Sequence, residues 1–140
     1  MPLQTIIDEL HAATAASRTT LRLDVPGDDF PVVAEALAPG VNSIAGDRSF
    51  AIRTAGTATY LEREQKILVQ RDLIGVVPAP APELLERYGA RAQMLAPVIR
   101  DGRLAGIVSV HHCGGARDFT AAEVAALERA VAAVLAELPA

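Results

Sequence analysis

The chain lacks tryptophan and has a single cysteine and a single lysine among its 140 residues. With Cys113 as the only cysteine, no internal disulfide can form, and the two neighbouring histidines leave too few ligands for a structural zinc site. Aromatic residues make up only 4% of the sequence, so rings for stacking on nucleic-acid bases are scarce. The net charge of −4 also argues against a nucleic-acid partner.

Long apolar segments are absent as well. No apolar run approaches the roughly 20 residues needed to cross a bilayer. Residues 1–16 carry Asp8, Glu9 and His11 where a signal peptide has a basic region and an apolar region. We therefore expect a cytoplasmic protein with no membrane partner. The hydrophobic share of 51% includes 27 alanines, and the length fits one domain over residues 1–140 with an aliphatic core.

The spacing of apolar residues predicts alternating helices and strands. Helices are expected over 3–17, 49–64, 82–88 and 120–138, and strands over 18–25, 66–70, 92–99 and 104–110, while 30–38 fits either state. Asp101 and Gly102 between two apolar runs are typical of a two-residue hairpin turn. Thr120 and Glu123 form a capping-box pattern. This order predicts an α+β fold with a mainly antiparallel sheet and helices on both faces.

The hairpin and the last helix carry a recognisable series of motifs. The segment 89–98 has Pro97 near the end of its expected strand, a turn with Gly102 follows, and a Leu-x-Gly strand then leads to an aromatic-Thr-x-x-Glu helix start at 119–123. In this order and spacing, the segment 85–138 resembles the GAF domain family, and residues 1–84 agree in the order of their elements. The strand end over 110–117 is similar to that of phytochrome-type GAF domains.

The resemblance implies a central antiparallel sheet with the terminal helices on one face and a small-molecule pocket on the other. Family ligands include cyclic nucleotides, haems, bilins, nitrate and small organic acids, and GAF domains usually regulate an attached output domain. Because the sequence contains no such domain, we expect a small-molecule sensor that acts through a separate partner protein. Apolar stripes with Ile6, Leu10, Leu135 and Leu138 predict a homodimer through residues 3–16 and 120–138.

The densest chemical cluster is the run His111, His112 and Cys113. Strand alternation places His111 and Cys113 on one face with Ser109, and His112 on the other. The phytochrome-type resemblance implies that His111 points into the pocket. The alternative, which the residues support equally, is a partly solvated histidine at a strand end.

Four further residues complete the candidate ligand site. Arg53 and Tyr60 lie on one side of the expected middle helix and could hold an anion, although the surface is the favoured position for Arg53 and partial burial for Tyr60. Gln93 and Met94 lie on the strand that pairs with the histidine strand, and only one of them can face the pocket.

We expect neither a metal nor a cofactor. A bilin needs a cysteine near a His-x-x-Tyr-like helix, which the chain lacks, and His111 alone is the support for haem. The alternative to a sensor is a small enzyme, such as the GAF subfamily that reduces methionine sulfoxide, with Cys113 or His111 as the reactive group. That subfamily uses two cysteines, so a lone thiol would need an external resolving thiol. We therefore favour the sensor.

Overall fold

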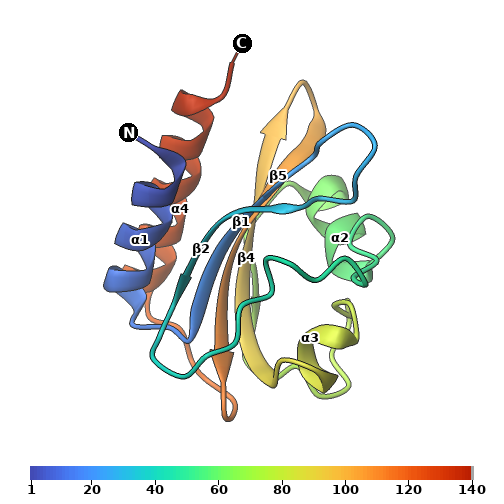
Figure 1. Cartoon of the computed structure of the whole chain (residues 1–140), viewed down its shortest axis with the longest axis vertical. Helices are drawn as coiled ribbons and strands as arrows, with labels where there is room; N and C mark the ends of the chain where they lie inside the picture. The colour runs from blue at the N-terminus through green and yellow to red at the C-terminus, as the bar shows by residue number, and fades with distance from the viewer. Residues whose placement is uncertain (140) are drawn as a thin grey trace.

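The computed structural model describes residues 1–139, in which helices cover both faces of one sheet (Figure 1). The helices are α1 (Leu3–Thr14), α2 (Gly56–Glu64), α3 (Glu83–Glu86) and α4 (Ala121–Glu137), and the strands are β1 (Arg18–Leu23), β2 (Val32–Leu37), β3 (Leu68–Gln70), β4 (Ala90–Arg100) and β5 (Arg103–Cys113). The strand order is β2-β1-β5-β4-β3, and every neighbouring pair is antiparallel. The predicted α+β class is confirmed.

The hairpin of β4 and β5 forms the centre of the sheet. Its turn residues Asp101 and Gly102 have φ values of 52° and 77°, the left-handed pair that a two-residue primed turn requires. Gly106 is needed for a different reason. A Cβ atom there would lie 2.7 Å from the main-chain oxygen of Arg22, so β5 can approach β1 this closely only without a side chain.

The terminal helices α1 and α4 lie side by side on one face of the sheet (Figure 1). Their buried residues, such as Ile7 and Leu127, pack against the sheet residues Met94, Val108 and Val110. The capping box is confirmed: the Thr120 hydroxyl accepts from the Glu123 amide, and the Glu123 carboxylate accepts from the Thr120 amide.

Two apolar residues cited for dimerisation are buried within the protomer. Ile6 and Leu10 are 3% and 2% exposed, because they pack on the sheet and on α4. Leu138 is also partly buried against this core, whereas Leu135 is exposed. The apolar stripe therefore explains the fold of one chain, and it gives less support to a dimer than the sequence pattern indicated.

The opposite face of the sheet is covered by α2, α3 and a long irregular segment (Figure 1). The prediction of a helix from residue 49 is wrong in its first half, because α2 begins only at Gly56. The amides of Ile52 and Arg53 bond to the Asp29 carboxylate instead of to a helical turn. Residues 44–55 therefore form a strap across this face. Residues 32–37 are the strand β2.

No helix within residues 1–139 is both long and apolar enough to cross a membrane.

Candidate functional site

A small cavity of about 40 Å³ lies between the sheet, the strap and the segment around α3. Its polar lining consists of Arg22, Thr57, Gln93, Ser109 and His111, and its apolar lining includes Ile44, Phe50, Ile52, Leu84, Leu95 and Ile107. The two central strands and β1 supply most of the polar groups, so rigid elements hold them in place.

The polar groups converge because of the residues that the paired strands set opposite one another. Gln93 of β4 and Arg18 of β1 both pair with His111 of β5, one on each side. Ser109, two residues earlier on β5, points to the same face. All four side chains are at least 95% buried, so their polar atoms must find partners within the protein or in a bound ligand.

His111 is held as a neutral imidazole by Arg18. The Nη1 atom of Arg18 lies 3.2 Å from Nδ1 of His111, and because a guanidinium can only donate, Nδ1 must accept. The ring proton is then on Nε2, which is the remaining donor of the ring. Burial, followed by the charges of Arg18 and Arg22, holds the pKa of His111 well below its usual 6.5. The other donors of Arg18 bond to the carbonyl of Asn42 at 2.7 and 3.3 Å.

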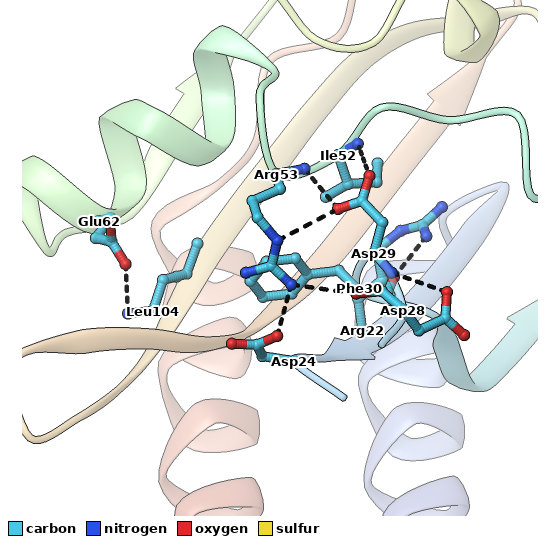
Figure 2. A network of polar contacts seen from close by, with 9 residues as sticks. All are labelled: Arg22, Asp24, Asp28, Asp29, Phe30, Ile52, Arg53, Glu62 and Leu104. Carbon is cyan, nitrogen blue, oxygen red and sulfur yellow. Dashed lines mark hydrogen bonds and ion pairs between the residues drawn. The ribbon is translucent and has the colours of Figure 1, made fainter. Parts of the chain in front are cut away.

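Arg22 is a buried guanidinium with an unused donor. The guanidinium carbon of Arg22 lies 5.2 Å from the centre of the Phe50 ring. Nη1 donates to the Phe30 carbonyl at 2.8 Å, a bond drawn in Figure 2. Nη2 has no hydrogen-bond partner among the described residues, although Arg22 is only 6% exposed. Burial lowers the pKa of Arg22 to about 10, so the group still carries its charge at neutral pH.

A chain of two amides borders the cavity on the β3 side. Nε2 of Gln93 donates to Oε1 of Gln70 at 2.8 Å, and Nε2 of Gln70 donates to the carbonyl of Pro78 at 2.7 Å. These bonds tie β4 and β3 to the loop that leads to α3. They also use donors that would otherwise be free to bind a ligand.

The strap is tied down near both of its ends. Figure 2 shows the Asp29 carboxylate accepting from the amides of Ile52 and Arg53 at 2.9 and 2.8 Å, and Arg53 Nη2 lying 2.7 Å from Asp24. Near the other end, Asp47 accepts from the Tyr88 hydroxyl at 2.6 Å. Hydrogen bonds from Ser49 and then Tyr88 lower the pKa of Asp47, so this tie is present at every physiological pH.

The structure brings His111, Ser109 and Gln93 together at the cavity and moves three other candidates away from it. Met94 is fully buried in the core beneath α1 and α4, so Gln93 is the residue that faces the cavity. Arg53 lies at the surface, bound to Asp24 and stacked on the Phe30 ring.

Tyr60 lies on α2 in a separate apolar cluster, under the guanidinium of Arg63. The site prediction is corrected at Tyr60, as at Met94 and Arg53. Met94 was ambiguous because strand alternation leaves the face undecided. Arg53 is at the surface and Tyr60 is partly buried, the positions favoured for them, and only their assignment to the ligand site is corrected.

The two residues after His111 also lie outside the cavity lining. His112 is partly exposed, and burial followed by the nearby charge of Arg117 lowers its pKa. The Cys113 thiol donates to the Tyr88 carbonyl across 3.5 Å.

Arg18 and Arg22 were missed as site residues. The signal in the sequence was their spacing: Arg18 and Arg22 are four residues apart on β1, so they share one face of the strand, and Leu21 lies on the other. Because helices were expected on both faces of the sheet, both arginines had to be buried. A buried charge needs a partner, so such a residue is a candidate for a binding site.

A model of the GAF domain family matches residues 2–138. The chain belongs to the GAF domain family. No curated protein is a match for it by sequence.

Solved structures with this fold include the chromophore-binding domain of Stigmatella aurantiaca phytochrome P1, with a TM-score of 0.78 and 18% identity over 99% of this chain and 53% of that one. The chromophore-binding domain of an unusual bacteriophytochrome from R. palustris has a TM-score of 0.77 and 16% identity over 96% and 53%. Cyanobacteriochrome receptor PixJ has a TM-score of 0.76 and 20% identity, over 98% of this chain and 94% of that one. This GAF chain spans about half of the two phytochrome chains, and at these identities the likeness shows the fold alone.

The prediction of no cofactor, and in particular of no bilin, is contradicted by these structures, because this is the fold of chromophore-binding domains of phytochromes. The absence of a cysteine on the middle helix was therefore not a sufficient ground for it. Pockets for drug-sized ligands usually measure about 300–1,000 Å³. In this structure the cavity is only about 40 Å³. A chromophore as large as a drug-sized ligand would therefore fit only if the strap lay farther from the sheet.

Proposed function

We propose that this GAF domain is a small-molecule sensor whose ligand binds in the cavity under the strap, between Arg22 and His111. The observation that carries the proposal is the buried ring of His111, which lines the cavity beside Ser109 and Gln93 and whose Nδ1 is taken by Arg18. A buried donor left without a partner costs about 1–3 kcal/mol, so a ligand that accepts from Nε2 of His111 recovers that cost. Because the ligand would bind the folded state alone, its presence would also stabilise the fold.

The strap is the element that we expect to respond to the ligand. It supplies the lining residues Ile44, Phe50 and Ile52, and it is held on the sheet by the buried packing of Ile44 and Phe50 and by hydrogen bonds to Glu35 and Asp29. A ligand in the cavity would contact these three side chains directly, so it would change how the strap packs on the sheet. A separate partner protein that reads this change, a homodimer through α1 and α4, and a cytoplasmic location stay predictions, as does the action of residues 1–140 as one domain.

A thermal-shift screen of small metabolites tests the proposal. We expect at least one metabolite to raise the melting temperature in a saturable manner. His111→Ala should weaken that response, because the ring and its Nε2–H donor are lost, whereas His112→Ala is the matched control on the other face and should leave it intact. Equal losses in both variants would contradict this location for the site, and a panel without any stabilising metabolite would contradict the sensor.

A second candidate, chromophore binding, is favoured by the phytochrome and cyanobacteriochrome structures that share the fold. The test is to mix the purified protein with a linear tetrapyrrole and to follow visible absorbance through size exclusion. Absorbance that elutes with the protein and disappears in His111→Gln would support this function. Free pigment alone in the later fractions would count against it.

The enzyme alternative has less support from the geometry. The Cys113 thiol contacts the Tyr88 carbonyl and does not line the cavity, so a ligand held near His111 would not meet the sulfur. We therefore keep the sensor as the proposed function.

A further inference from the structure

We propose that the free edge of β2 is a surface that fits a second copy of this chain, and that the side chain of Gln4 keeps it closed by taking the place of a neighbouring strand. The residues involved belong to β2 and to the first turn of α1. They lie outside the ligand cavity, so the edge and the cavity can be tested separately.

The sheet has two free edges, because its strand order is β2-β1-β5-β4-β3. A free edge exposes main-chain donors and acceptors with which another chain can pair. The edge strand β3 has only three residues, and so short a strand offers little to a partner. The edge strand β2 has six residues and ends at the exposed residue Leu37. The edge that requires protection is therefore β2.

A β-bulge protects the first half of β2. Ala34 pairs with Leu21 and Val32 pairs with Arg22, so Val33 is an extra residue without an opposite residue on β1. A bulge interrupts the regular ladder and bends the edge away from a straight partner strand. The regular part of the edge is therefore limited to residues 34–37.

Gln4 covers the middle of this regular part. Its Nε2 donates to the Glu35 carbonyl at 2.8 Å, and its Oε1 accepts from the Glu35 amide at 3.3 Å. A neighbouring antiparallel strand exchanges the same two bonds with a residue of a hydrogen-bonded pair. Nε2 also donates to Asp8 at 2.9 Å, four residues later on α1, which holds the amide in this orientation. The Gln4 amide is thus a side-chain substitute for one residue of a strand.

The regular part of the edge is complementary to itself. Main-chain groups of every second residue point to the same side of a strand, so those of Leu37 point outward with those of Glu35. A two-fold axis at Ala36 would set Glu35 of each copy opposite Leu37 of the other, with two main-chain hydrogen bonds in each of these pairs. The two alanines would meet at the centre, where their small side chains allow a close approach. Every one of these bonds needs the amide or the carbonyl of Glu35, and Gln4 occupies both.

The test compares the wild type with Gln4→Ala. Gln4 is exposed and alanine is the strongest helix former, so α1 should stay intact. We expect exchange of the Glu35 amide, followed by NMR in dilute solution, to become roughly five- to tenfold faster, because the bond from Gln4 is lost. At higher concentration, light scattering should give a mass that approaches twice that of the wild type. Comparison at equal concentration removes any contribution from association through α1 and α4.

Gln65→Ala is the matched control. Gln65 is also an exposed glutamine whose side chain donates to a main-chain carbonyl, but this carbonyl belongs to Gly102 in the turn between β4 and β5. Its replacement should leave both the mass and the exchange of the Glu35 amide as in the wild type.

A charge at position 37 tests the register of the pairing. In the Gln4→Ala chain, Leu37→Glu would place a carboxylate opposite Glu35 of the second copy and should return the mass to the wild-type value. Leu37→Lys would place the opposite charge there and should strengthen the association. Unchanged exchange of Glu35 in Gln4→Ala, or a wild-type mass at every concentration, would overturn the proposal. Association that responds equally to both charges would also overturn it, because contact through an exposed core does not depend on this register.

Discussion

His111 couples the folding equilibrium to pH. In the folded protein it is 4% exposed, it accepts from Arg18 through Nδ1, and its pKa lies well below 6.5. In the unfolded chain its pKa is near 6.5, so below that pH the unfolded state binds a proton that the folded state does not. The stabilising contribution is therefore fully present above pH 6.5 and is lost as the pH falls from 6.5 toward the folded pKa. The loss approaches about 1.4 kcal/mol per pH unit.

The assay is thermal unfolding, followed by circular dichroism between pH 7.5 and 5.5, of the wild type and of His111→Gln. At pH 5.5 the wild type should have lost up to about 1.4 kcal/mol through His111, which for a domain of this size lowers the melting temperature by up to about 5 °C. His111→Gln cannot take up the proton, and its amide oxygen can still accept from Arg18, so most of this slope should vanish. His112, whose pKa is also lowered, adds a smaller term of the same sign that His112→Gln removes. An unchanged slope in His111→Gln would refute the reasoning.

Four further predictions concern packing, capping, assembly and chemistry. Gly106→Ala should destabilise the fold by about 1–3 kcal/mol in urea unfolding, because its Cβ would meet the main-chain oxygen of Arg22 at 2.7 Å. Thr120→Ala should cost about 1 kcal/mol in the same assay through the lost cap of α4. Light scattering should give twice the chain mass of 14.7 kDa, and Leu135→Arg should give the single mass; a monomeric wild type would contradict the homodimer. Cys113→Ser should keep ligand binding, and methionine sulfoxide reduction that depends on this thiol would promote the enzyme alternative.

The elements that the sequence predicts well are those governed by local rules. The turn at Asp101 and Gly102 needs two left-handed residues, and few dipeptides supply them. The start of α4 follows from the reciprocal bonds of Thr120 and Glu123, which lie three residues apart. Neighbouring residues fix both features, so a single sequence is enough to find them.

The strap shows where local rules fail. Residues 49–55 have helical spacing, yet the amides of Ile52 and Arg53 bond to Asp29, more than 20 residues earlier in the chain. The carboxylate of Asp29, which is remote in the sequence, accepts the backbone hydrogen bonds that a helix would otherwise satisfy within the segment. The spacing of apolar residues in a short segment does not show that such a carboxylate is available. Because residues 49–55 are not helical, Arg53 and Tyr60 do not share one helical face.

The choice between Gln93 and Met94 was decided by a single irregularity in the hairpin. The turn pairs Arg100 with Arg103, and a regular ladder from that pair would set Met94 opposite Ser109, on the cavity side. The register shifts by one residue between Val98 and Ile99, so Gln93 is opposite His111 and Met94 is opposite Val110 in the core. A slip of one residue moves every later side chain to the other face, and a bulge produces that slip without a distinct local sequence. The polar character of the cavity wall on β4 therefore depends on a bulge about five residues away, which the pairing of the whole hairpin determines.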